Sequence, residues 1–160
     1  MTARPLLLFA VALVAGCSNV PLGETANRPR PMIEQIETTP DGTSTAATVD
    51  SYKADLAQRI YAVNSTLVYT TRPQALLRSI VVLKYTVDSA GNLVRSEIAR
   101  SNHDRATEAT ALATLRKSAP FPKPSPHLLR NGRLEMHESW LFNNDGRFQL
   151  RSLALVQMDE

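Results

Sequence analysis

The stretch from Ile80 to Pro126 reads IVVLKYTVDSAGNLVRSEIARSNHDRATEATALATLRKSAPFPKPSP and decides the fold. It contains, in order, an alternating strand, a glycine turn, a second strand, an alanine-rich helix and a proline-spaced exit. Because side chains of a strand point alternately to opposite faces, only one face of the first strand can enter a core. That face holds Val81, Leu83, Tyr85 and Val87.

A turn, a second strand and a helix follow. The segment Asp88-Ser89-Ala90-Gly91 suits a type I turn, in which Asp opens the turn and Gly supplies a positive φ. We expect Val94 and Ile98 of the second strand to face inward. Asp104 is the expected N-cap of the helix, and Pro120 ends it. One helical face is formed by Ala111, Leu112, Leu115 and Ala119.

A further helix is expected before this stretch, capped by Asp50 or Ser51. Its apolar stripe has a spacing close to 3.6 residues and consists of Tyr52, Leu56, Ile60 and Val63.

Two more strands are expected after the stretch. Residues 134–142 alternate, with Glu138 the odd polar member of the inward face. Asn143-Asn144-Asp145-Gly146 is a hairpin signal, and a fourth strand is predicted over residues 147–155. The fold class is therefore α+β, with elements in the order α-β-β-α-β-β, a small antiparallel sheet in the order 2-1-3-4, and both helices on one face.

The strand-turn-strand from Val81 to Ile98, the Ala111–Lys117 helix and the Ala119-Pro120-Phe121-Pro122 exit resemble the C-terminal domain family of TonB and TolA. The resemblance covers the last two thirds of the chain and implies a periplasmic protein-binding domain. Members of that family pair the last strand of their sheet with a short peptide of an outer-membrane partner. The chain departs from the family at Thr107 and Glu108, and it has an extra C-terminal hairpin.

The N-terminus resembles a bacterial lipoprotein signal. Arg4 precedes an apolar run, Leu6–Ala15, which is too short for a membrane span and suits a signal peptide. Val14-Ala15-Gly16-Cys17 resembles the lipobox, which implies that Cys17 is acylated and anchors the protein to membrane lipid. Ser18 favours the outer membrane, with the domain on the periplasmic side. The alternative is an ordinary signal peptide with a chance cysteine.

These features divide the chain into three parts: a signal peptide over residues 1–16, a lipidated Cys17 with a disordered tether over residues 17–49, and the TonB/TolA-like domain over residues 50–160. The tether prediction rests on its prolines and its low apolar content, which cannot offset the entropy of ordering.

The residues give little support for catalysis. His103, His127 and His137 are not at metal-ligand spacing, and no glycine-rich phosphate loop is present. The acid pair Glu135 and Glu138 would lie on opposite faces of a strand, which is unsuitable for acid–base work. We expect no enzyme activity and no cofactor. The scattered charges, with a net charge of +3, also argue against a nucleic-acid partner.

The remaining chemistry is that of the backbone at a sheet edge. We expect the fourth strand either to offer a new edge, with Arg147, Gln149 and Arg151 lining its polar face, or to block the site used in the family. Those polar side chains are equally suited to guarding the edge against aggregation. The expected function is an adaptor that binds envelope proteins by strand addition, and strand exchange would also allow a homodimer. The alternative is a structural accessory lipoprotein of a secretion or envelope-assembly complex.

Overall fold

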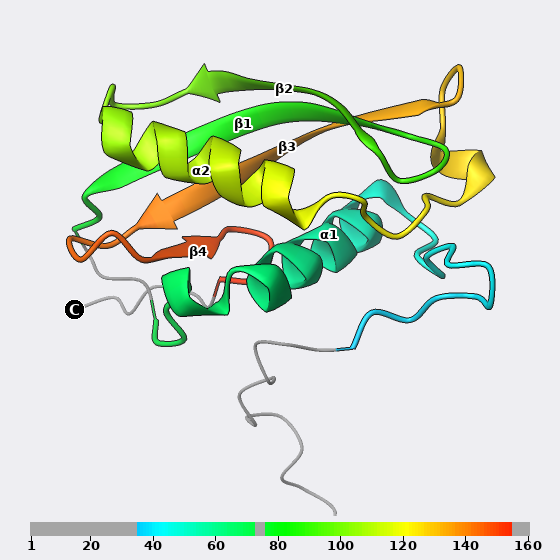
Figure 1. Ribbon diagram of the computed structural model, residues 1–160, viewed down its shortest axis with the longest axis horizontal. Helices are drawn as coiled ribbons and strands as arrows, with labels where there is room; N and C mark the ends of the chain where they lie inside the picture. The colour runs from blue at the N-terminus through cyan, green and yellow to red at the C-terminus, as the bar shows by residue number, and fades with distance from the viewer. Residues whose placement is uncertain (1–34, 73–75, 155–160) are drawn as a thin grey trace, which may run out of the picture.

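A computed structural model describes residues 35–72 and 76–154 (Figure 1). Two α-helices and a four-stranded sheet form the fold. In chain order the elements are α1 (Val49–Val63), the 3₁₀ turn η1 (Ser65–Leu67), β1 (Ser79–Asp88), β2 (Leu93–Arg100), α2 (Arg105–Ser118), the 3₁₀ turn η2 (Pro126–Leu128), β3 (Arg133–Phe142) and β4 (Phe148–Leu150).

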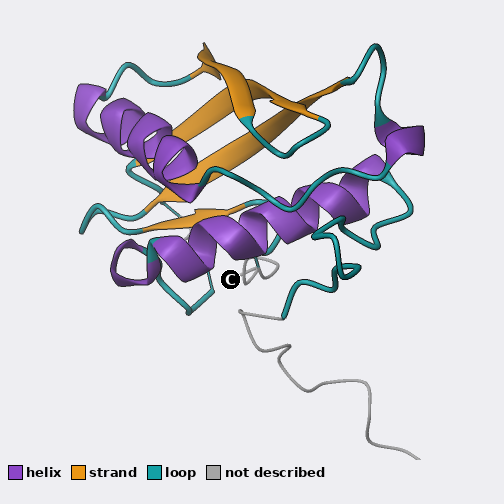
Figure 2. Cartoon of the chain, turned by 45° about the vertical axis from the view of Figure 1, so that its right-hand side comes forward, coloured by secondary structure: helices purple, strands orange, loops and turns teal. Residues whose placement is uncertain are grey.

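The predicted topology is confirmed. The strands are antiparallel and lie in the order β2-β1-β3-β4. Figure 2 shows both helices in front of the same face of the sheet, and the opposite face of β1 and β3 has no helix over it. β1 is central because it pairs with β2 along one side and with the whole of β3 along the other.

The core lies between the helices and the sheet. The predicted inward residues of β1 are all at most 1% exposed, as are Tyr52, Leu56 and Ile60 of α1. Trp140 is fully buried, and its Nε1 donates to Thr114 Oγ1 of α2 at 3.1 Å. Trp140 is therefore a core residue, tied by this bond to α2. Phe148 is the centre of a buried aromatic cluster: its ring contacts that of Tyr61 edgewise and those of Trp140 and Phe142 at a tilt.

The Ala-Pro-Phe-Pro exit of α2 packs against the β1–β2 turn. The Phe121 N–H donates to the Gly91 carbonyl at 2.9 Å, and the Tyr52 hydroxyl donates to the Pro122 carbonyl at 2.7 Å. Gly91 has a φ of +83°, as the predicted turn requires. A Cβ at this position would lie 2.1 Å from the Phe121 carbonyl oxygen, so the close approach also requires glycine.

Three local expectations differ from the structure. The N-cap of α1 is Thr48, which exchanges capping-box hydrogen bonds with Ser51, so the predicted caps at Asp50 and Ser51 are displaced. Val94 and Ile98 are 46% and 38% exposed instead of buried. A register shift between Thr86 and Val87 leaves Val94 without a partner on β1, and Ile98 lies on an edge strand that α2 only partly covers.

The C-terminal hairpin is shorter than predicted. β4 consists of Phe148–Leu150, and a turn follows it because the Leu153 and Ala154 N–H groups donate back to the Leu150 carbonyl. The hydrogen bonds of a local turn replace those of a continued ladder, so the prediction of a strand over residues 147–155 is wrong over residues 151–154, and residue 155 lies outside the described residues.

Residues before α1 lie against the domain. The Ser44 N–H donates to the Lys123 carbonyl at 2.9 Å, and the Lys123 N–H donates to the Gly42 carbonyl at 3.0 Å. Ser44 and Ala46 are buried. Residues 42–46, which the sequence assigns to the tether, therefore pack against the domain.

Candidate partner-binding edge of the sheet

The outer edge of β4 is covered by the protein's own chain. A parallel bridge joins Val68 to Phe148, and the Tyr69 N–H donates to the Phe148 carbonyl at 3.2 Å. Gln149 is fully buried, and its Nε2 donates to the Tyr69 and Thr71 carbonyls at 2.9 and 2.5 Å. The expectation that β4 offers a free edge is wrong, because the segment after η1 returns beside it.

The three residues predicted to line that edge do not lie together on one polar face. Gln149 points into the protein, as described above. Arg147 is exposed and pairs with Asp145 through Nε at 2.7 Å, within its own turn. Arg151 is exposed and lies beyond β4. The alternation of side chains along a strand cannot reveal this arrangement. It determines which residues share a face of the sheet, and not whether another part of the chain covers that face.

β3 is open along its first half. β4 pairs only with Trp140–Phe142. The Arg151 N–H donates to the Ser139 carbonyl, and Arg130 and Arg133 exchange both of their main-chain hydrogen bonds. In an antiparallel ladder, alternate residues direct both main-chain groups to the same side. Glu135 and His137 therefore direct N–H and C=O groups outward, and no hydrogen bond among the described residues occupies them.

The open stretch of β3 ends at Ser139, whose main-chain N–H is occupied by the Glu138 carboxylate. The Glu138 side chain is 3% exposed, and its Oε1 accepts a hydrogen bond from the Ser139 N–H at 2.7 Å. Burial raises the pKa of the Glu138 carboxyl above its usual range, although the hydrogen bond from the Ser139 N–H opposes that rise. The sequence marks Glu138 as odd on its face, and the structure explains it as a cap on an edge N–H group.

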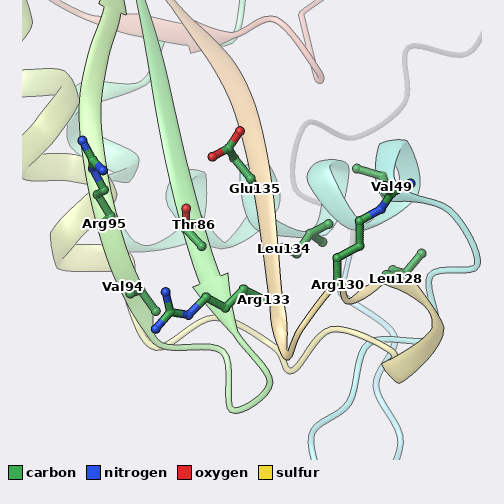
Figure 3. Close-up of a pocket in the computed structure, with 9 residues that line it drawn as sticks. All are labelled: Val49, Thr86, Val94, Arg95, Leu128, Arg130, Arg133, Leu134 and Glu135. Atoms are coloured by element: carbon green, nitrogen blue, oxygen red, sulfur yellow. The ribbon is translucent and has the colours of Figure 1, made fainter.

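A groove lies at the other end of the open stretch (Figure 3). It has a volume of about 670 Å³ and is lined by residues of α1, η2, the turn before β3, the end of β1 and the starts of β2 and β3: Val49, Thr86, Val94, Arg95, Leu128, Arg130, Arg133, Leu134 and Glu135. Figure 3 shows Leu134, Arg130, Leu128 and Val49 on one side of β3, with Thr86, Arg95 and Glu135 on the other. A strand added to β3 would place alternate side chains on these two sides.

The second open edge belongs to β2. Among the described residues, nothing pairs with its outer side over Leu93–Arg100. This strand has two register shifts, and it carries an ion pair at 2.6 Å between the exposed Arg95 and the half-buried Glu97. Bulges and charges are the devices that protect an edge from pairing. The β3 edge, which has a groove beside it, is the better candidate for binding.

The polar residues near the start of α2, and His127, have structural roles. Asp104 caps α2 by accepting hydrogen bonds from the Ala106 and Thr107 N–H groups, and Arg78 pairs with it at 2.8 Å. His103 precedes this cap with a φ of 64°, and the Glu108 carboxylate accepts a hydrogen bond from the Ser101 hydroxyl. His127 Nε2 lies 3.0 Å from the Ala47 carbonyl.

Across residues 35–72 and 76–154, no group of three or more His, Cys, Asp or Glu side chains is placed to hold a metal ion. The helices in that same part of the chain are too short or too polar to span a bilayer. Cys17, the signal peptide and most of the predicted tether lie outside the described residues.

A comparison with curated proteins finds a partial relative. Over 71 residues, 44% of this chain, the sequence is 31% identical to a protein described as Protein TonB from Pseudomonas putida. The match spans 29% of that protein's length. No family model matches the chain, and no solved structure matches it. The similarity suggests a TonB-like domain and an association with the Gram-negative envelope.

Proposed function

We propose that this protein is a lipoprotein adaptor of the outer membrane, anchored through acylated Cys17. Its TonB-like domain faces the periplasm and binds an extended segment of another envelope protein by adding a strand to β3. The similarity to TonB supports an envelope protein-binding domain that is not an enzyme. The lipobox-like sequence before Cys17 supports the anchor.

The open stretch of β3 is the observation that carries this proposal. Its main-chain groups at Glu135 and His137 are unpaired among the described residues, and the groove lies directly beside them. Strand addition uses such groups for affinity and adjacent side-chain sites for selectivity. β4 covers only the last part of β3, so the extra hairpin leaves the rest of this edge accessible.

Ladder hydrogen bonds alone would give weak binding. Each contributes about 1 kcal/mol net, so the N–H and C=O groups of Glu135 and His137 would together supply about 4 kcal/mol. That free energy corresponds to a dissociation constant of about 1 mM. The groove must therefore supply most of the useful affinity through side-chain contacts, which fits its mixed apolar and charged lining.

A proline at residue 137 tests the edge. The His137 N–H points outward, so His137→Pro removes a donor to an incoming strand without removing a bond to β1. His137→Ala is the matched control, because it loses the same imidazole and keeps the N–H. A photo-crosslinker at Glu135 should capture an envelope protein in cells, and His137→Pro should reduce that capture far more than His137→Ala.

The expected partner is identified from the crosslinked product. Thermal unfolding of both variants checks that each remains folded. Equal capture by folded His137→Pro and His137→Ala proteins would contradict strand addition at β3. If a crosslinker at Arg95 of β2 captures the partner protein and one at Glu135 does not, the binding site lies at the β2 edge and not at the β3 edge.

The anchor has a separate test. Cells grown with radiolabelled palmitate should incorporate label into the protein, and Cys17→Ala should abolish that incorporation and release the protein from the membrane fraction. An unlabelled wild-type protein would contradict the lipoprotein part of the proposal while leaving strand addition in place.

A further inference from the structure

A tight turn presents two arginines at the entrance to the open edge of β3. The Arg130 N–H donates to the Arg133 carbonyl at 2.8 Å, and the Arg133 N–H donates to the Arg130 carbonyl at 3.1 Å. Asn131 and Gly132 between them both have positive φ values, 52° and 70°. Because main-chain bonds fix this turn, the positions from which the two guanidinium groups extend are defined before any partner binds.

The other charges around the groove are mostly paired. Arg95 pairs with Glu97 at 2.6 Å, and Glu135 pairs with Lys84 at 3.1 Å. Within the described ranges, no carboxylate lies within 4.0 Å of the guanidinium nitrogens of Arg130 or Arg133.

The two arginines differ in their neighbours. Arg133 lies opposite Asp88 in the β1–β3 register. Hydrogen bonds from Asn92 hold the pKa of Asp88 below its usual range, and the charge of Arg133 lowers it further. Arg130 has no such acidic neighbour in the register, and its side chain extends beside Leu134 toward Val49 (Figure 3).

We propose that the segment bound at β3 carries an aspartate or glutamate that pairs with Arg130, with Arg133 adding to the attraction, next to apolar side chains that contact Leu134, Leu128 and Val49. This inference rests on the proposed strand addition. Arginine suits the role because its planar guanidinium binds a carboxylate with two parallel hydrogen bonds. The apolar residues and the cation lie on the same side of β3, so one face of a short strand would contact both.

Labelled peptides provide the test. The probes are fluorescein-labelled ten-residue peptides of alternating Val and Thr, in sets that carry one Asp, Asn or Lys at each position in turn. Binding to the wild-type protein is measured by fluorescence anisotropy. An exposed ion pair changes affinity by about five-fold, so the best Asp peptide should bind about five-fold more tightly than its Asn counterpart.

Variants then assign that preference to the arginines. Arg130→Gln with Arg133→Gln should remove the preference for Asp over Asn and leave the affinity for the Asn peptide nearly unchanged. Arg116→Gln is the matched control, because it removes an exposed positive charge from α2 and leaves the groove intact. It should keep the preference.

The outcomes separate this inference from the proposed function. If the Asp and Asn peptides bind equally, and His137→Pro weakens both, strand addition stands and the acidic preference is refuted. If no peptide binds, the proposed strand addition fails as well. Vesicles that contain phosphatidylglycerol distinguish a lipid ligand: binding to them that Arg130→Gln with Arg133→Gln abolishes, without a peptide preference, would assign these arginines to the membrane surface and overturn the inference.

Discussion

Replacement of Gly91 by alanine tests how the β1–β2 turn holds the exit of α2. Gly91 and Gly42 both have a φ of +83°, so alanine is strained at either position. At Gly42 an added Cβ has nothing within 4 Å, and the expected cost is the left-handed conformation alone, about 1–2 kcal/mol. Gly42→Ala is therefore a control that isolates conformational strain.

At Gly91 the added Cβ would also lie 2.1 Å from the Phe121 oxygen and 3.3 Å from the Pro122 oxygen. Both atoms are main chain, so the exit segment must move away. That movement breaks the Phe121–Gly91 hydrogen bond and strains the Tyr52–Pro122 hydrogen bond, each of which contributes about 1 kcal/mol. We expect Gly91→Ala to destabilise the protein by about 3–4 kcal/mol, roughly 2 kcal/mol more than Gly42→Ala.

Urea unfolding provides the measurement, with fluorescence of the single, fully buried Trp140 as the probe. With an m-value of about 1–2 kcal/mol/M, the midpoint of Gly91→Ala should lie about 1–2 M below that of Gly42→Ala. Equal midpoints for the two variants would show that the exit segment can move away from the added Cβ without any loss in the free energy of unfolding. The proposed link between this turn and the Ala-Pro-Phe-Pro exit would then be refuted.

Three further predictions concern stability. Burial raises the pKa of the Glu138 carboxyl, so the folded protein binds this proton more tightly than the unfolded chain, and wild type loses stability as the pH rises above the usual glutamate range of about 4.5. Glu138→Gln should therefore stabilise the protein by about 1–3 kcal/mol at pH 7, with the gain vanishing near pH 4 in urea titrations; a gain that is independent of pH would contradict the assignment. Gln149→Leu should destabilise by about 2 kcal/mol and speed amide exchange at Tyr69, because it removes two buried hydrogen bonds; unchanged exchange would show that the cover over β4 does not depend on this side chain. Thr48→Ala should cost about 1 kcal/mol, and Asp50→Ala much less, if Thr48 is the cap of α1; the reverse order in thermal unfolding would restore the cap to Asp50.

The structure also changes how the extra hairpin relates to partner binding. β4 is short, and the segment from Val68 to Thr71 covers its outer edge through main-chain and side-chain hydrogen bonds. The hairpin therefore does not extend the proposed binding edge, and it limits the open part of β3 to the segment between Arg133 and Ser139. A partner segment bound there would be short, which places most of the selectivity in the groove residues.

The sequence by itself determined the elements and their order. Alternation identified the core face of β1, the turn residues identified Gly91, and the spacing of apolar residues identified both helices. These signals are local, because each depends on the geometry of a few consecutive residues. The order β2-β1-β3-β4 followed because one apolar helix face and one apolar sheet face must cover each other.

Only the tertiary structure decided which edge is open. Gln149 alternates with buried neighbours and reads as a solvent-facing residue, yet the returning segment at Tyr69 buries it. Arg130 and Leu134 line a groove with Val49, which lies far from them in the sequence. The physical reason is that every strand carries the same main-chain N–H and C=O groups, so the sequence has no local signal for which of these groups stay unpaired. Whether they meet solvent or another part of the chain depends on contacts between distant residues, which no local period encodes.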